Sequence, residues 1–189
     1  MSEIEIRPLS PSSSVRAMLS EMLIEVVANG GSVSFMHPLE QERADAFWDG
    51  SLAAAARNER VVLGAWDGDA LVATVTLLLD FPPNQPHRAE IAKMMTRLSH
   101  RGRGIARTLM VEAERLAVER GRTLLVLDTA SDEGAAGLYE KLGFIEVGLI
   151  PDFALKPLGG LTGTIFYYKR IGPSAEPVGA GSSATVEAR

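Results

Sequence analysis

Cysteine is absent from the 189-residue chain, and this absence rules out several kinds of chemistry. Disulfide bonds, a cysteine nucleophile and cysteine-based metal sites all need a thiol. Histidine is scarce as well, because His37, His87 and His100 are scattered and form no ligand spacing typical of a metal site. We therefore expect no metal, and we interpret each histidine as an ordinary loop residue.

Positive charge and long apolar runs are also in short supply. The chain has 19 Lys and Arg against 24 Asp and Glu, a net charge of −5, which disfavours a broad surface for nucleic acid. No apolar run approaches the roughly 20 residues that cross a bilayer. The first residues lack the basic and apolar regions of a secretory signal. We expect a cytoplasmic protein with no nucleic-acid or membrane partner.

Apolar residues make up 46% of the chain, which is enough for the core of one domain of ordinary size. Residues 172–189 differ, because Gly, Pro, Ser, Ala and Glu dominate there and large apolar side chains are lacking. Such a segment buries too little surface to offset the entropy of ordering it. We expect one folded domain over residues 1–171 and a disordered tail over residues 172–189.

Hydrophobic periodicity predicts a mixed α/β protein with helices on the faces of a sheet. Helical spacing of apolar residues occurs in residues 15–28, 38–58, 105–120 and 132–142. Strand-like patterns occur in residues 3–7, 60–66, 71–79, 88–96, 123–127, 144–149 and 164–169. The strand at 123–127 is nearly all apolar, which is typical of a strand buried on both faces. Trp48 and Trp66 are expected to pack in the core.

One connection between a strand and a helix combines glycine with positive charge. Arg101-Gly102-Arg103-Gly104 joins the strand at 88–96 to the helix at 105–120. Glycines let the backbone turn tightly and leave its N–H groups uncovered, and the helix N-terminus adds partial positive charge. Arg101 and Arg103 contribute guanidinium groups suited to phosphate oxygens. This pattern predicts a site for a pyrophosphate.

Three other interpretations of these glycines compete with this one. A Walker-type loop needs Lys and then Ser or Thr after its last glycine, but Ile105 and Ala106 follow Gly104. A dinucleotide-binding fingerprint needs a third glycine where Arg107 stands. The third interpretation, a plain connection with glycines for geometry alone, stays open on these residues.

Two motifs in sequence order resemble those of the GNAT superfamily of acetyltransferases. Arg101-x-x-Gly104-x-Ala106 is similar to the acyl-CoA motif, usually Gln/Arg-x-x-Gly-x-Gly/Ala. Downstream, Asp132-x-x-Ala135-x-x-Leu138-Tyr139-x-x-x-Gly143-Phe144 is similar to a helix motif that usually begins with Asn. The resemblance covers residues 4–171. It implies a mostly antiparallel sheet of six to seven strands with a parallel, splayed central pair, flanked by about four helices, and it allows a homodimer.

Three further segments resemble the tabtoxin-resistance branch of the superfamily: residues 31–36, residues 88–90 and residues 127–129. Members of this branch acetylate a small β-lactam amino-acid toxin. The resemblance implies an acetyl-CoA-dependent N-acetyltransferase that acts directly on a small amine or amino-acid-like compound, with toxin or antibiotic detoxification as a role. Two alternatives remain, a protein or peptide amine acetyltransferase and a non-catalytic CoA-binding sensor.

The resemblance also implies which residues hold the co-substrate acetyl-CoA. They are Met95, Thr96, Arg101, Gly102, Arg103, Gly104, Ile105, Ala106 and Asp132. A backbone N–H, that of Met95 by resemblance, is expected to polarise the thioester carbonyl. Asp132 departs from the asparagine usual at its position, and its carboxylate also suits a helix N-cap.

Three side chains are candidates for proton transfer. Tyr139 matches the family's usual acid for the departing thiolate, and a phenol with a pKa of about 10 is suited to that step. Glu90 and Asp128 lie on neighbouring strands, and either carboxylate could take the proton of the acceptor's ammonium group. We expect Glu90 to be the base and Asp128 to steer the ammonium.

The acceptor side is expected to be lined by Ser32, Phe35 and Met36, if the loop between the first two helices folds over the sheet. The alternative for these residues is a surface loop with its aromatic ring tucked into the core.

Overall fold

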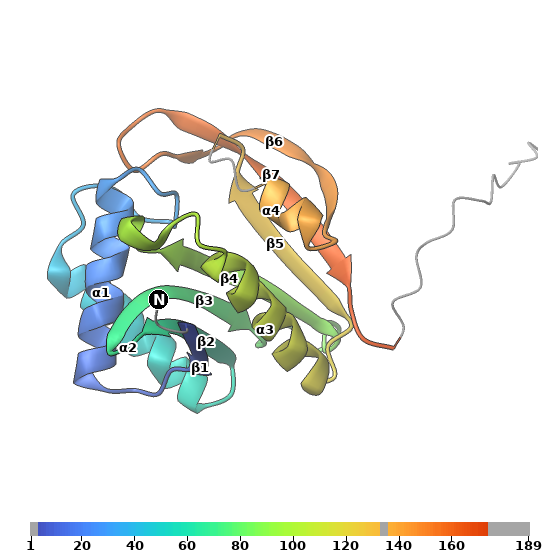
Figure 1. Cartoon of the computed structure of the whole chain (residues 1–189). Coiled ribbons are helices and arrows are strands. Elements are labelled where there is room, and N and C mark those ends of the chain that lie inside the picture. The colour runs from blue at the N-terminus through green and yellow to red at the C-terminus, as the bar shows by residue number, and fades with distance from the viewer. Residues whose placement is uncertain (1–3, 133–135, 174–189) are drawn as a thin grey trace, which may run out of the picture.

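The computed structural model describes residues 4–132 and 136–173, which form a seven-stranded sheet with helices on both faces (Figure 1). The strand order is β1-β2-β3-β4-β5-β7-β6. The strands are β1 (Ile4–Pro8), β2 (Arg60–Asp67), β3 (Ala70–Leu78), β4 (Arg88–Thr96), β5 (Leu124–Ala130), β6 (Ile145–Leu155) and β7 (Leu161–Arg170). The helices are α1 (Ser13–Ala28), α2 (Gln41–Ala56), α3 (Ile105–Glu119) and α4 (Ala136–Lys141). The expected fold is confirmed.

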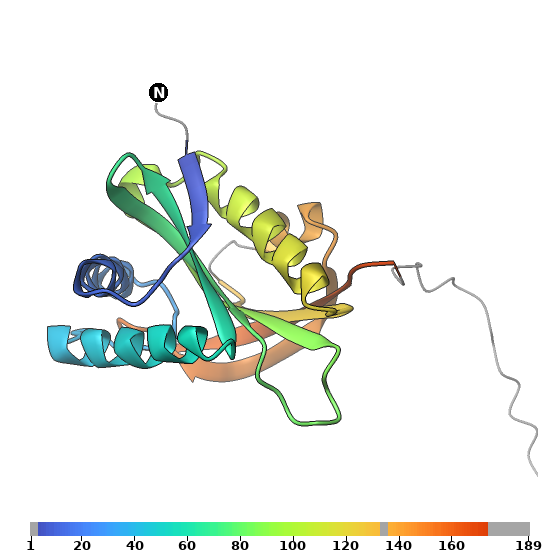
Figure 2. The same ribbon diagram turned by 90° about the horizontal axis from the view of Figure 1, so that it is seen from below.

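Two apolar cores lie on opposite faces of the sheet. On one face α3 packs against β2, β3 and β4 and buries Leu109 and Met110 completely or nearly so. On the other face α1 and α2 pack against each other and against β2 to β4, with Leu23 and Trp48 fully buried. Trp66 belongs to this second core, so both tryptophans are core residues as expected. In Figure 2, α1 and α2 lie on one side of the strands and α3 lies on the other.

The parallel pair β4–β5 is paired over only a short length. Its register runs from Arg88 opposite Leu124 to Glu90 opposite Val126. Beyond Glu90, β4 continues alongside β3 while β5 continues alongside β7. The two strands therefore diverge at their carboxyl ends, which is the splayed central pair expected from the sequence (Figure 1).

β4 contains a bulge in the part that has left β5. Ala92 and Met95 pair with β3 residues that are only two apart, so β4 has one residue more than its partner. Lys93 lies in this bulge with a φ of +51°, in the left-handed region that non-glycine residues rarely adopt. The extra residue reverses the alternation of the strand, and Met95 then points into the second core at 2% exposure.

The structure corrects one expected element bound and one expected burial pattern. α2 begins at Gln41 and not at Pro38, because Leu39 is buried in the second core and Glu40 is still extended at φ −69°, ψ 143°. β5 is buried on one face only: Leu125 and Leu127 are covered, whereas Asp128 is exposed. The contacts of α1 and α2 fall mainly on β2 to β4, so these two helices leave the second face of β5 largely uncovered within the described part of the chain.

The C-terminal hairpin is longer than expected. β6 runs past Pro151 to Leu155, because an edge strand tolerates a proline and a register shift lies between Ile150 and Ala154. The predicted helix over residues 132–142 appears as α4, and residues 133–135 lie outside the described residues. The expected tail lies outside them too from residue 174 on. None of the described helices is both long and apolar enough to span a bilayer.

Candidate active site

A cleft of about 600 Å³ lies where β4 and β5 diverge. Its walls come from β4, β5, the turn before α3, the loop after α1, α4 and the β6–β7 hairpin. Eleven of the expected site residues line it, namely Ser32, Glu90, Met95, Thr96, Arg101, Gly102, Gly104, Ile105, Ala106, Asp128 and Tyr139. Four others do not, namely Phe35, Met36, Arg103 and Asp132.

The turn before α3 presents unused main-chain donors to this cleft. Gly102 and Gly104 have φ values of +75° and +78°, and a Cβ added to either would meet no protein atom within 4 Å. The N–H groups of residues 102–107 donate to no main-chain carbonyl among the described residues. α3 also lacks a side-chain cap and has no acidic residue in its first turn. An open helix N-terminus of this kind suits the phosphates of acetyl-CoA.

The two arginines of the turn have different surroundings. Arg101 lines the cleft, and its Nε donates to the carbonyl of Thr96 at 3.4 Å. Arg103 instead directs both Nη atoms at the carboxylate of Asp67, each at 3.3 Å. Asp67 also lies 3.3 Å from Nε2 of His100, which lines the cleft. The β2–β3 hairpin thus gives Arg103 a carboxylate partner that is not among the residues lining the cleft.

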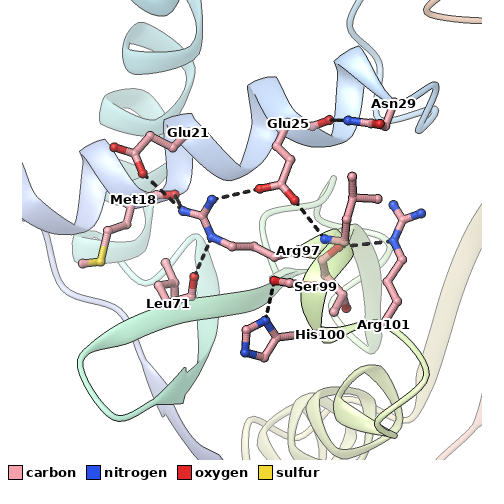
Figure 3. A network of polar contacts seen from close by, with 11 residues as sticks. Met18, Glu21, Glu25, Asn29, Leu71, Arg97, Ser99, His100 and Arg101 are labelled. Atoms are coloured by element: carbon pink, nitrogen blue, oxygen red, sulfur yellow. Dashed lines mark hydrogen bonds and ion pairs between the residues drawn. The ribbon is translucent and has the colours of Figure 1, made fainter.

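Arg97 fastens the start of the turn to α1 (Figure 3). Its Nη1 lies 2.9 Å from the carboxylate of Glu25, and its Nε donates to the carbonyl of Leu71 at 3.1 Å. The other oxygen of Glu25 accepts the N–H of Leu98 at 2.9 Å. Glu21 adds a longer contact to Arg97 at 3.3 Å. Because these bonds cross from α1 to β4 and β3, they fix where the turn begins.

Two carboxylates share one face of the diverging strands. Glu90 stands opposite Val126, so Asp128, two residues further along β5, projects to the same side of the sheet. Burial raises the pKa of Glu90; nearby Arg88 opposes the rise and the charge of Asp128 adds to it. Oδ2 of Asp128 accepts a hydrogen bond from Thr164 at 2.9 Å. A carboxylate with a raised pKa is suited to accept a proton near neutral pH.

Tyr139 reaches the cleft from the other side of the sheet. It belongs to the core that contains α3, is 6% exposed, and lies on α4. Its ring packs edge-on against Phe144, with centroids 6.0 Å apart, and at a tilt against Tyr167 at 5.7 Å. The phenol and the two carboxylates therefore approach the gap between β4 and β5 from opposite faces.

Asp132 binds the C-terminal hairpin. One carboxylate oxygen accepts from Thr162 at 2.7 Å and the other lies 3.1 Å from Nζ of Lys156. These two hydrogen bonds lower the pKa of Asp132. The side chain joins the segment after β5 to the β6–β7 hairpin. The expected N-cap role involves residues 133–135, which lie outside the described residues.

The loop after α1 contributes Ser32 to the cleft and keeps Phe35 out of it. Phe35 packs edge-on against Phe47 of α2 at 5.2 Å, and Met36 is 41% exposed. Phe35 and Met36 therefore follow the alternative given for this loop, in which it lies at the surface with its aromatic ring against the core. Residues 31–34 still form part of the cleft wall.

Lys93 is a cleft residue that the sequence interpretation missed. Its Nζ donates to Oγ of Ser34 at 2.9 Å, and desolvation lowers its pKa against the opposing effect of Asp128 and Glu90. A signal was present in the sequence. A lysine at position 93 breaks the alternation of β4, in which Ala89 and Ile91 point inward. A charge at an expected inward position indicates a bulge or a functional residue.

The described residues contain no group of three or more His, Cys, Asp and Glu side chains that could hold a metal ion.

Comparison with known proteins gives a consistent result. The acetyltransferase (GNAT) family model matches residues 25–144. Human N-acetyltransferase 8B is 34% identical over 82 residues, which is 42% of this chain and 36% of the human protein, so the match spans about a third of that relative's length.

Solved structures extend the likeness to most of the chain. An N-acetyltransferase from Staphylococcus aureus Mu50 superposes with a TM-score of 0.76 at 19% identity, covering 89% of this chain and 99% of the other. A protein from Salmonella typhimurium, solved with its cofactor acetyl-CoA, has a TM-score of 0.74 at 17% identity, covering 92% and 97%. At such identities the likeness concerns the fold.

Proposed function

Because the chain belongs to the acetyltransferase (GNAT) family, we propose that it is an N-acetyltransferase that transfers the acetyl group of acetyl-CoA directly to the amine of a small, amino-acid-like compound. One observation carries the proposal. Residues 102 and 104–107, whose N–H groups donate to no main-chain carbonyl among the described residues, line the same cleft as Glu90, Asp128 and Tyr139. A diphosphate-binding turn and proton-transfer groups in one cleft are what the reaction requires.

Each part of the cleft has a role in this proposal. Acetyl-CoA supplies an activated thioester, and the turn with Arg101 binds its phosphates. Glu90 takes the proton of the acceptor's ammonium group, which leaves a neutral amine, and Asp128 holds that ammonium in place. Tyr139 provides the proton for the sulfur that departs. Direct transfer fits a chain without cysteine, since no acyl-cysteine can form.

The acceptor class rests on the branch resemblance and on the charges in the cleft. Residues 31–34, which belong to the segment resembling the tabtoxin-resistance branch, form part of the wall. Glu90 and Asp128, from the other two matching segments, face the opening. Detoxification of a small amino-acid toxin is the role that follows from this acceptor class.

The leading rival is a protein or peptide acetyltransferase on the same fold. Another is a sensor that binds CoA without catalysis, and the presence of Glu90, Asp128 and Tyr139 in one cleft argues against it. The acceptor profile separates all three.

A homodimer through β6 is part of the proposal. β6 is an edge strand, and alternate residues Ile145, Val147 and Leu149 are 54%, 68% and 55% exposed. Edge strands in monomers are usually protected by charge, proline or bulges, and residues 145–150 of β6 carry a single charge, that of Glu146. A two-fold axis would pair β6 antiparallel with itself. Sedimentation equilibrium is expected to give a dimer that Val147→Lys dissociates.

A direct test of the function measures thiol release from acetyl-CoA with panels of amino acids, other small amines and peptides, with mass spectrometry of the products. We expect the mass of at least one small amine to rise by about 42 units, because an acetyl group replaces one hydrogen of the amine. Acetylation confined to peptides would favour the rival enzyme. CoA binding with no amine consumed would favour the sensor.

A further inference from the structure

We propose that Lys93 binds an anionic group of the acceptor, so that the acceptor carries a carboxylate close to its reactive amine. The inference rests on the proposed acetyl transfer and specifies the acceptor more narrowly. It assigns Lys93 as a specificity-determining residue and Ser34 as the residue that positions it.

The first observation is the unusual backbone at both residues. Lys93 lies at φ +51° in the bulge of β4, and Ser34 lies at φ +73° in the loop after α1. Both residues line the cleft, and they are joined by the 2.9 Å hydrogen bond although 59 positions separate them in the sequence. Left-handed conformations cost non-glycine residues about 1–2 kcal/mol each and tend to persist at functional sites. Here the two strained residues, Ser34 and Lys93, hold the ammonium group of Lys93 at the wall of the cleft.

The second observation is that this ammonium has donors to spare. An ammonium has three N–H donors, and Ser34 takes one. Among the described residues, no carboxylate lies within ion-pair distance of Nζ of Lys93, while partly buried Lys169 pairs with Glu114 at 2.6 Å. The ring of Phe47, 5.8 Å from Nζ, covers part of the remaining surface. A partly desolvated cation with unfilled donors gains most from an anion supplied by a ligand.

The third observation is the arrangement of opposite charges around the opening. Asp128 and Glu90 both influence the pKa of Lys93, so the cation and the two carboxylates bound one region of the cleft. An amino acid brings an ammonium and a carboxylate a few bonds apart. Its ammonium would meet Glu90 and Asp128, while its carboxylate would meet Lys93. A simple amine or the first residue of a peptide lacks the second group.

The experiment compares matched acceptors on wild-type protein and variants. The twenty common L-amino acids are tested against their carboxamides, which keep the amine and the side chain and imitate a peptide's first residue. For each amino acid that the wild type acetylates, we expect kcat/KM to be roughly tenfold to a hundredfold higher than for its carboxamide. One charge-assisted contact allows a difference of this size. Lys93→Met should bring this ratio close to one, mainly by raising KM, and Lys93→Arg should restore part of it.

Two measurements keep the result interpretable. Lys169→Met removes a partly buried lysine outside the cleft and should leave the ratio as in the wild type. Acetyl-CoA affinity by calorimetry should be the same for Lys93→Met and wild type, which shows that the fold and the cofactor side are intact. An unchanged ratio in Lys93→Met, or a wild type that prefers amides, overturns the inference while acetyl transfer itself stands.

If no amine is acetylated at all, the proposed function fails. The role of Lys93 is then tested by measuring ligand binding instead of activity. The same acid and amide pairs are then titrated into the CoA complex and followed by ligand-observed NMR. Selective binding of the acids that is lost in Lys93→Met supports the subsite. Equal binding, or none, contradicts it.

Discussion

Arg97 and Glu25 are joined at 2.9 Å across 72 positions of sequence, and their contact ties the end of β4 to α1 (Figure 3). The same carboxylate accepts the N–H of Leu98. One side chain of α1 therefore holds both Arg97, which follows β4, and Leu98, three residues before Arg101. α1 consequently helps to fix the segment that leads into the turn.

Glu25→Gln tests this link. We expect a loss of about 1–3 kcal/mol in the free energy of unfolding, because a charge-assisted bond to a partly buried guanidinium is weakened, and a severalfold weaker affinity for acetyl-CoA. Thermal unfolding and calorimetry measure the two effects. Glu21→Gln is the control, since Glu21 is 63% exposed and its contact with Arg97 is longer. Equal effects of both variants would contradict a special role for Glu25.

Gly104→Ala tests the turn itself, and Gly121→Ala is the matched control variant. Both glycines have φ above +70°, and a Cβ at either meets no protein atom within 4 Å, but only Gly104 lines the cleft. Both variants should lose about 1–2 kcal/mol of stability from backbone strain. Only Gly104→Ala should weaken acetyl-CoA binding, by about tenfold or more, since its methyl group takes space beside the open N–H groups. Similar affinities for the two variants would remove the turn from the binding site.

Glu90→Gln tests the base. Only the ionised carboxylate can accept a proton, so the rate should rise with pH through the raised pKa of Glu90. The variant should lose about a hundredfold or more in kcat and should lack this acidic limb. In Asp128→Asn the limb should persist and move to lower pH, because a charge that raises the pKa of Glu90 is gone. A limb that vanishes in Asp128→Asn and survives in Glu90→Gln would exchange the two roles.

Tyr139→Phe tests the proton donor. The ring contacts with Phe144 and Tyr167 can remain, so stability and acetyl-CoA affinity should change little. Turnover should fall by about tenfold to a thousandfold, depending on how far water replaces the phenol. Steady-state kinetics with the best acceptor provides the measurement. Full turnover in the variant would mean that the proton comes from elsewhere.

Local signals in the sequence were sufficient for the central part of the molecule. β4 has the predicted bounds, and the predicted helix over residues 105–120 is α3, because glycines mark the turn before α3 and Gly121 marks its end. The placement of Glu90, Asp128 and Tyr139 in one cleft agrees with the resemblance, which already implied a parallel, splayed central pair of strands. α2 and β6 were predicted less well, since burial of Leu39 and the tolerance of an edge strand for Pro151 depend on tertiary structure.

Long-range pairing accounts for what the sequence could not provide. Arg103 looked equivalent to Arg101 until the fold brought Asp67 beside it. Lys93 and Ser34 meet only because the loop after α1 and the bulge of β4 share one cleft. Asp132 is likewise defined by Thr162 and Lys156, which come from a hairpin later in the chain. None of these pairs has a spacing that a sequence pattern could reveal.

A crystal structure of the protein with acetyl-CoA is the most direct test of the central claim, which is that the turn at residues 101–106 holds the diphosphate. We expect phosphate oxygens within hydrogen-bond distance of the N–H groups of the turn, and the acetyl group between β4 and β5 near Glu90 and Tyr139. Acetyl-CoA bound elsewhere, with those N–H groups directed at solvent or at another part of the chain, would contradict the account.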